Sequence, residues 1–201
     1  MSNKKTYIAL AIIKTMPFEF KKTNIPDLII IEPKVFKDNR GFYLETYKKS
    51  EFQKNRIKEE FLQDNFSFST KKVLRGMHFQ KDPHSQGKLI WVAKGEVFDV
   101  AVDLRKNSPT FKKWFGIVLS EENKKMFYIP AGFAHGFCVL SEEAQFSYKV
   151  TKEYAPESES GFIWDDKDIK IKWPVNNPVV SEKDLKLPEF KDLKIEFSYK
   201  Q

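Results

Sequence analysis

The stretch KLIWVAKGEVFDVAVDLR, residues 88–105, decides the fold class of this chain. Within it, the apolar residues of Phe98–Leu104 alternate one by one with Asp, Ala and Asp. Alternation with a period of two is typical of a β-strand with one buried face. Lys94 and Gly95 separate the two halves of the stretch, and we predict that they form a hairpin turn between two strands.

Short strand-like runs continue on both sides of this stretch. They are LIIIE (28–32), WFGIVLS (114–120), KMFYIP (125–130), HGFCVLS (135–141) and AQFSYKV (144–150). Many short strands separated by turn residues predict an all-β sandwich or barrel, and a jelly roll is one such architecture. Helix signals are few. Ser50 followed by Gln53 resembles a capping box, and Ser181–Asp184 is a second candidate helix start.

The chain has 201 residues, 41% of them hydrophobic, which fits a single soluble domain with a real core. We expect residues 16–201 to form this domain. Residues 1–15 are expected to be a dispensable extension, with an extra edge strand as the alternative. The apolar run at 7–13 is too short to span a bilayer, so no membrane partner is expected.

The net charge of +7 points to an anionic partner. Only four of the 35 basic residues are arginine, the residue favoured for forked recognition of phosphate or carboxylate. We see no basic stripe interleaved with aromatic residues, so nucleic acid is not expected as a partner. The one cysteine, Cys138, lies in an apolar run, and we expect it to be a core residue in a reduced, cytoplasmic compartment.

The densest polar cluster is LRGMHFQKDPHSQGK, residues 74–88. It holds two histidines together with an arginine and a lysine within 14 residues: Arg75, His78, His84 and Lys88. Histidine is the usual proton-transfer residue near neutral pH, and we interpret the cluster as functional, with structural histidines as the alternative. In a regular strand, Arg75 and His78 would point to opposite faces.

A second cluster, IPAGFAHGF (129–137), has the P-x-G-x-x-H pattern of cupin barrels. In metal-dependent cupins this histidine, here His135, is a ligand together with an upstream H-x-H…E set. Upstream of it stand only His78 and His84, which makes the ligand set incomplete, so we predict no metal and a substrate contact for His135. Tyr148 is a third candidate: it would serve as an acid if it faced the cavity of His78, and as packing otherwise.

Six ordered blocks resemble the dTDP-4-dehydrorhamnose 3,5-epimerase family, whose fold is a cupin-type jelly roll. They are DNRGFYLETY (38–47), QDNFSFS (63–69), VLRGMHFQ (73–80), QGKLIWVAKGEVFDVAVDLRKNSPTF (86–111), IPAGFAHGF (129–137) and YKVTKEYAP (148–156). The resemblance implies an isomerase that inverts C3 and C5 of dTDP-4-dehydro-6-deoxy-D-glucose to give dTDP-4-dehydro-L-rhamnose, without a cofactor.

The resemblance also implies roles for individual residues. The catalytic roles fall on His78 as base, Asp184 as its partner, Tyr148 as acid and Lys88 near the keto oxygen. Substrate binding falls on Phe36, Arg40, Glu45, Gln63, Asn65, Arg75, His135 and Tyr154. The resemblance further implies a homodimer in which the early strand region of one subunit completes its neighbour's site.

Two positions depart from the family pattern. Phe66 stands where histidine is common, and Trp91 stands where arginine is common, so we expect an effect on nucleotide or sugar preference. Two alternatives stay open: an epimerase that acts at C3 or C5 alone or on another nucleotide-linked 4-keto sugar such as a heptose, and a metal-dependent cupin oxygenase. A non-catalytic binding module is disfavoured, because binding alone needs no acid and base.

Overall fold

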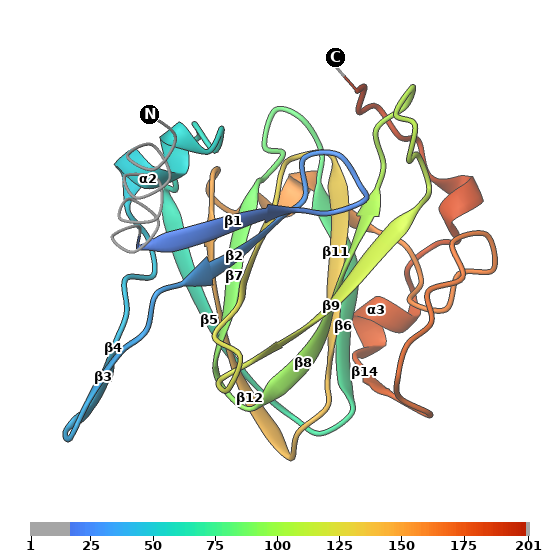
Figure 1. Cartoon of the computed structure of the whole chain (residues 1–201). Helices are drawn as coiled ribbons and strands as arrows, with labels where there is room; N and C mark the ends of the chain where they lie inside the picture. The colour runs from blue at the N-terminus through green and yellow to red at the C-terminus, as the bar shows by residue number, and fades with distance from the viewer. Residues whose placement is uncertain (1–16, 200–201) are drawn as a thin grey trace.

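The computed structural model describes residues 17–199, and it confirms an all-β jelly roll of two packed sheets (Figure 1). The strands of the first sheet are β1 (Phe18–Lys22), β2 (Ile29–Pro33), β5 (Gln63–Thr70), β7 (Lys88–Lys94), β10 (Met126–Ile129) and β12 (Glu143–Val150). Those of the second are β6 (Val73–Gln80), β8 (Glu96–Asp103), β9 (Trp114–Ser120), β11 (Phe133–Val139), β13 (Glu159–Gly161) and β14 (Val179–Val180). The expectations for residues 1–15 lie outside the described residues.

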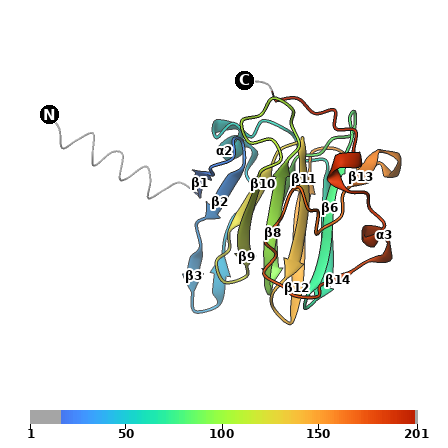
Figure 2. The same cartoon turned by 90° about the vertical axis from the view of Figure 1, so that its right-hand side faces the viewer.

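The remaining elements are short. They are the hairpin β3 (Phe36–Asp38) and β4 (Gly41–Tyr43), the helices α2 (Lys49–Lys54) and α3 (Glu182–Leu185), and the 3-10 turns η1 (Pro156–Ser158) and η2 (Phe190–Asp192). The hairpin and α3 lie on opposite sides of the molecule in both views (Figures 1 and 2). No helix in residues 17–199 is both long and apolar enough to cross a membrane.

The order of strands is β1-β2-β10-β7-β12-β5 in the first sheet and β13-β6-β11-β8-β9 in the second, with β14 beside β6. The predicted hairpin at Lys94 and Gly95 is therefore wrong. Both flanking strands exist, but β7 pairs with β10 and β12, whereas β8 pairs with β9 and β11. The turn carries the chain from one sheet to the other, a long-range arrangement that local turn chemistry does not specify.

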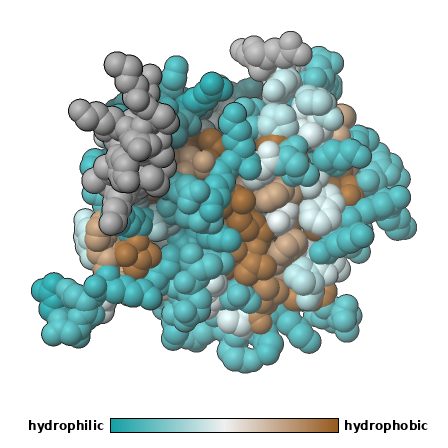
Figure 3. Space-filling view, viewed as in Figure 1, coloured by the Kyte–Doolittle hydropathy of each residue, from teal (hydrophilic) through white to brown (hydrophobic). Residues whose placement is uncertain are grey.

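Strand β8 is buried on both faces, not on one as its alternation predicts. Val97 and Ala101 face the main core between the sheets, together with Phe127 and Phe146. The opposite face packs against the C-terminal segments through residues such as Val100, Val102, Phe162, Ile169, Phe190 and Phe197. Hydrophobic residues also reach the surface in a band through the middle of the face seen in Figure 3. Cys138 is a buried core residue, as expected.

One of the two helix starts follows its sequence signal. Ser181 caps α3, because its hydroxyl accepts a hydrogen bond from the Asp184 backbone N–H at 3.1 Å. The capping box at Ser50 and Gln53 is wrong: the N-cap of α2 is Lys48, and it makes no side-chain cap hydrogen bond. Burial of Phe52 against Phe18 and Phe20 holds α2 instead.

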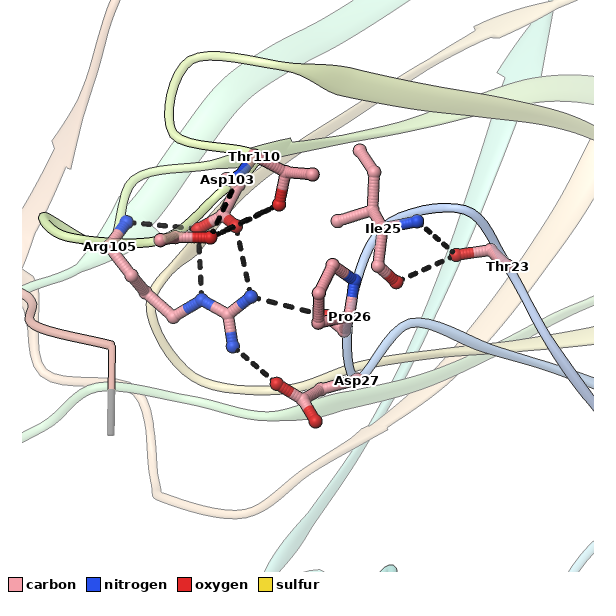
Figure 4. A network of polar contacts seen from close by, with 8 residues as sticks. Thr23, Ile25, Pro26, Asp27, Asp103, Arg105 and Thr110 are labelled. Atoms are coloured by element: carbon pink, nitrogen blue, oxygen red, sulfur yellow. Dashed lines mark hydrogen bonds and ion pairs between the residues drawn. The ribbon is translucent and has the colours of Figure 1, made fainter. Parts of the chain in front are cut away.

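A buried ion pair anchors the loop after β8 (Figure 4). The Arg105 guanidinium donates to both oxygens of Asp103, at 2.9 Å each, and to Asp27 at 2.7 Å. Asp103 also accepts from Ser108 and Thr110, which fills its acceptor sites. This network ties the β1–β2 turn to the second sheet and accounts for one of the four arginines.

Candidate active site

Strands of both sheets line a cavity of about 500 Å³. It brings together half of the twelve site residues predicted from the sequence, which come from β6, β7, β11, β12 and α3: Arg75, His78, Lys88, His135, Tyr148 and Asp184. A slightly larger cavity, about 560 Å³, lies between the β1–β2 turn and α2. None of the sequence-predicted site residues lines that second cavity.

The centre of the first cavity is a histidine–aspartate pair. His78 Nε2 lies 2.8 Å from Asp184 Oδ1, and the Gly76 backbone N–H donates to Asp184 Oδ2. Burial by itself raises the pKa of the Asp184 carboxyl, but the hydrogen bonds from His78, Gly76 and Ser181 outweigh it and hold the pKa below its usual value. An ionised carboxylate only accepts, so Nε2 of His78 carries the hydrogen and Nδ1 is left as the basic nitrogen.

A bulge in β6 places Arg75 and His78 in the same cavity, which a regular strand would not do. On β11, His135 pairs with His78 and Phe137 pairs with Arg75. The two β11 residues are two positions apart in sequence, whereas their β6 partners are three positions apart, so β6 contains one extra residue here. Glycine makes the bulge possible, because a Cβ on Gly76 would lie 2.6 Å from the Gly136 Cα. The extra residue reverses the period of two at this point of the strand.

Lys88 and Tyr148 enter the cavity from the first sheet, opposite the strand that carries His78. The Lys88 Nζ lies 5.9 Å from the centroid of the Tyr148 ring. Burial lowers the pKa of Lys88 to about 8, against the opposing charges of Asp99 and Glu159. Burial also raises the pKa of Tyr148, so this phenol keeps its proton at neutral pH.

His135 completes the cavity wall beneath these groups. Its Nε2 lies 2.9 Å from Asp99 Oδ2, and both side chains are buried. Burial lowers the pKa of His135, although Asp99 opposes this shift, and the ring is therefore neutral at pH 7. The sequence did not indicate Asp99 as a site residue, because a polar residue in an alternating strand is expected to face solvent.

A second polar group lies between β5 and β13. The Gln63 amide donates to Asn65 at 2.8 Å and accepts from the Tyr154 backbone N–H. The Tyr154 hydroxyl donates to Glu159, which also pairs with Lys183 at 2.6 Å. The sequence analysis missed Glu159 and Lys183, for which no local motif exists.

Three predicted substrate contacts lie away from this cavity in the same chain. Phe36 and Arg40 belong to the β3–β4 hairpin, and Glu45 follows it. The hairpin projects from the body of the molecule, on the side away from α3 (Figures 1 and 2). Arg40 pairs with Asp38 of its own hairpin at 2.6 Å, and the ring of Phe36 is half exposed.

The two departures from the family pattern also lie outside the cavity. Phe66 is on the outer face of β5 and is 63% exposed, whereas Trp91 on β7 packs against the hydrophobic cluster that contains Phe52 and Met126. Within residues 17–199, no three His, Cys, Asp or Glu side chains are grouped to hold a metal ion.

Comparison with known proteins shows the family of this chain. A family model described as dTDP-4-dehydrorhamnose 3,5-epimerase matches residues 22–192. The chain is 56% identical over 172 residues to the dTDP-4-dehydrorhamnose 3,5-epimerase of Shigella flexneri, which covers 85% of this chain and 95% of that protein. It is also similar to the crystal structure of dTDP-6-deoxy-D-glucose-3,5-epimerase from Legionella pneumophila in complex with dTDP-4-keto-L-rhamnose. There the TM-score is 0.88 at 45% identity, covering 92% of this chain and 100% of that one. For the dTDP-4-dehydrorhamnose 3,5-epimerase of Elizabethkingia anophelis, the TM-score is 0.85 at 48% identity, over 88% of this chain and 98% of that one.

Proposed function

Because this chain belongs to the dTDP-4-dehydrorhamnose 3,5-epimerase family, we infer that it is an isomerase that inverts C3 and C5 of dTDP-4-dehydro-6-deoxy-D-glucose. The product is dTDP-4-dehydro-L-rhamnose. The observation that carries this function is the convergence of a His–Asp pair, a protonated phenol and a half-buried ammonium group in one cavity.

His78 is the base of the proposed reaction. The hydrogens at C3 and C5 are acidic because both carbons are adjacent to the C4 carbonyl. Nδ1 of His78 removes such a hydrogen as a proton, and the electron pair moves onto the C4 oxygen to form an enolate. Asp184 then stabilises the imidazolium that results, as in other His–Asp pairs.

Tyr148 is the acid. It lines the cavity from β12, in the sheet opposite β6, so base and acid reach the sugar from different walls. When the phenol returns a proton to the face opposite the one that lost it, the carbon is inverted. The tyrosinate formed in this step lies near the Lys88 ammonium. To restore the starting state, the His78 imidazolium releases its proton to solvent and the tyrosinate takes one up from solvent.

Lys88 supplies the charge that the enolate needs. An ammonium group in a partly water-excluded site stabilises an oxyanion far better than it does in bulk water. With a pKa of about 8, Lys88 is protonated in most of the molecules at neutral pH. Arg75, on the same wall as His78, adds a forked cation suited to the diphosphate.

We further propose a homodimer in which the β3–β4 hairpin reaches the partner's cavity. The hairpin carries Phe36 and Arg40 but projects away from its own cavity, so these residues serve a site only if that site belongs to another subunit. Arg40 is 85% exposed, which leaves its guanidinium accessible for a phosphate group. A cytoplasmic location also remains our proposal, supported by the single buried thiol at Cys138.

The test of the function is conversion of the substrate. Purified protein is incubated with dTDP-4-dehydro-6-deoxy-D-glucose, and the product is identified by NMR. We expect dTDP-4-dehydro-L-rhamnose, undiminished after treatment with a chelator. A protein that consumed oxygen and lost its activity with its iron would instead be the cupin oxygenase.

A further inference from the structure

Asp99 is a buried carboxylate for which the proposed reaction has no role so far. It lies on β8 beneath the cavity and is completely inaccessible to solvent. One oxygen, Oδ2, accepts from His135 Nε2 at 2.9 Å. The other, Oδ1, is buried and has no hydrogen-bond partner among residues 17–199. Burying a carboxylate destabilises the fold unless the carboxylate is fully paired, so this arrangement calls for a function.

The charge of Asp99 acts on two cavity groups. Its negative charge opposes the effect of burial on Lys88, and it does the same for His135. Glu159 is the other anion that acts on Lys88. The remaining titratable side chains that line the cavity are Arg75, His78, Tyr148, Lys183 and Asp184. Of the two anions, Glu159 is already paired with Lys183, whereas the ion pair of Asp99 within the described residues is with His135, which is charged only when protonated.

The hydrogen bond between Asp99 and His135 also fixes the tautomer of His135. A carboxylate cannot donate, so the hydrogen between the two groups belongs to Nε2 of His135. Since the ring is neutral at pH 7, its Nδ1 is then an acceptor. A neutral His135 therefore does not disfavour the ammonium form of Lys88. A protonated His135 would repel that ammonium group.

We propose that Asp99 is a positioning residue, which fixes the Nε2–H tautomer of His135 and holds Lys88 as the ammonium ion that stabilises the enolate. The inference rests on the proposed function for the role of the ammonium ion. Asp99 itself acts through Lys88 and His135 and has no role as base or acid.

The direct test is the titration of Lys88 without substrate. In protein with ¹³Cε-labelled lysine, the signal that is absent from Lys88→Arg is followed against pH, and we expect a midpoint near 8. In Asp99→Asn, which keeps the shape of the side chain, the midpoint should fall by about one pH unit or more. Asp64→Asn is the matched control, because it removes an exposed carboxylate that pairs with Lys149 on the outer surface. An unchanged midpoint in Asp99→Asn overturns the proposal.

A second measurement needs no variant at position 99. ¹⁵N spectra of the three imidazoles should show His135 protonated at Nε2 and bare at Nδ1. The reverse tautomer overturns the proposal, even if Asp99→Asn does not fold.

Activity separates this inference from the proposed function. In Asp99→Asn, kcat/KM for epimerisation should fall about threefold or more at pH 7.5 and recover towards the wild-type value near pH 6. If kcat/KM of Asp99→Asn were lowered by the same factor at every pH, the role of Asp99 would be merely structural and the inference would be overturned. If wild-type protein does not epimerise the substrate at all, the proposed function fails, while the two NMR measurements still decide the role of Asp99.

Discussion

His78 and Asp184 lie 106 positions apart in the sequence, yet their side chains meet at 2.8 Å. The carboxylate accepts hydrogen bonds from His78 and from the Gly76 N–H, and the Ser181 cap holds the start of the short helix that carries Asp184. The bulge in β6 and the cap of α3 therefore serve the same contact. The pair combines a base with the anion that stabilises its protonated form.

Replacement of His78 by Ala should abolish exchange of the C3 and C5 hydrogens with solvent, because it removes the imidazole whose protonated form Asp184 stabilises. Asp184→Asn should retain the fold and lower kcat by about 100-fold or more, since the imidazolium loses its counter-charge. The measurement is NMR-detected exchange at pH 7. His84→Ala is the matched control, because His84 lies near Glu157 outside the cavity and its loss should leave the rate unchanged. Normal exchange in His78→Ala would show that the base is another residue.

Replacement of Tyr148 by Phe should separate the two proton transfers. The ring and its packing remain, but the donor is lost, so hydrogens continue to exchange while inversion slows by about 100-fold. Product formation and exchange are measured on the same sample. Tyr199→Phe is the control, because that ring packs against Arg105 away from the cavity. Equal loss of exchange and inversion would contradict an acid role.

The pH dependence should report Lys88. The reaction needs the ammonium form, which is lost as the pH rises through about 8. We therefore expect kcat/KM, which reports the free enzyme, to fall about tenfold per pH unit above that value. Burial raises the pKa of Tyr148, so the phenol does not account for a limb near pH 8. In Lys88→Arg the limb should disappear, because arginine stays charged; a limb that persists would assign it to another group.

Mixing inactive variants should test the shared site. His78→Ala destroys the cavity of its own chain, and Arg40→Ala damages the hairpin that we place in the partner's cavity. Mixed dimers then contain one intact site, so random mixing should restore about a quarter of the wild-type activity. A mixture of His78→Ala with Asp184→Asn is the control and should restore nothing. No recovery with Arg40→Ala would mean that each chain builds its own site.

Removal of Arg105 should lower the free energy of unfolding, because Arg105 holds a structural ion pair and not the catalytic cavity. Asp103 is fully buried, and Arg105→Ala leaves it without its counter-ion. We expect a loss of about 3–5 kcal/mol in the free energy of unfolding, measured by urea denaturation. Lys58→Ala, at an exposed position, should change it by less than about 0.5 kcal/mol. A loss below about 1 kcal/mol for Arg105→Ala would contradict the account of this network.

Local patterns predict most of the strands but not their partners. The alternation in Phe98–Leu104 identifies β8, because an apolar residue at every second position is typical of a β-strand and not of a helix. It says nothing of the C-terminal segments that cover the second face of β8, since those come from the far end of the chain. The hairpin predicted at Gly95 fails for the same reason: a turn limits local geometry, whereas the neighbours of β7 and β8 are set by the whole jelly roll.

The candidate site follows the same division. His78, Lys88 and His135 stand in compact motifs, and the structure brings them into one cavity. The joint placement of Arg75 and His78 depends on a bulge that a period-two reading excludes. Asp99 was missed because a strand pattern cannot show which aspartates are buried.

In the proposed reaction, one cavity inverts two carbons of the same sugar. The most direct measurement is to incubate the protein with dTDP-4-dehydro-6-deoxy-D-glucose in deuterated water and to read by NMR which carbons take up deuterium. We predict deuterium at both C3 and C5 of dTDP-4-dehydro-L-rhamnose. Deuterium at only one of these carbons, with inversion there alone, would contradict the claim and identify a single-centre epimerase.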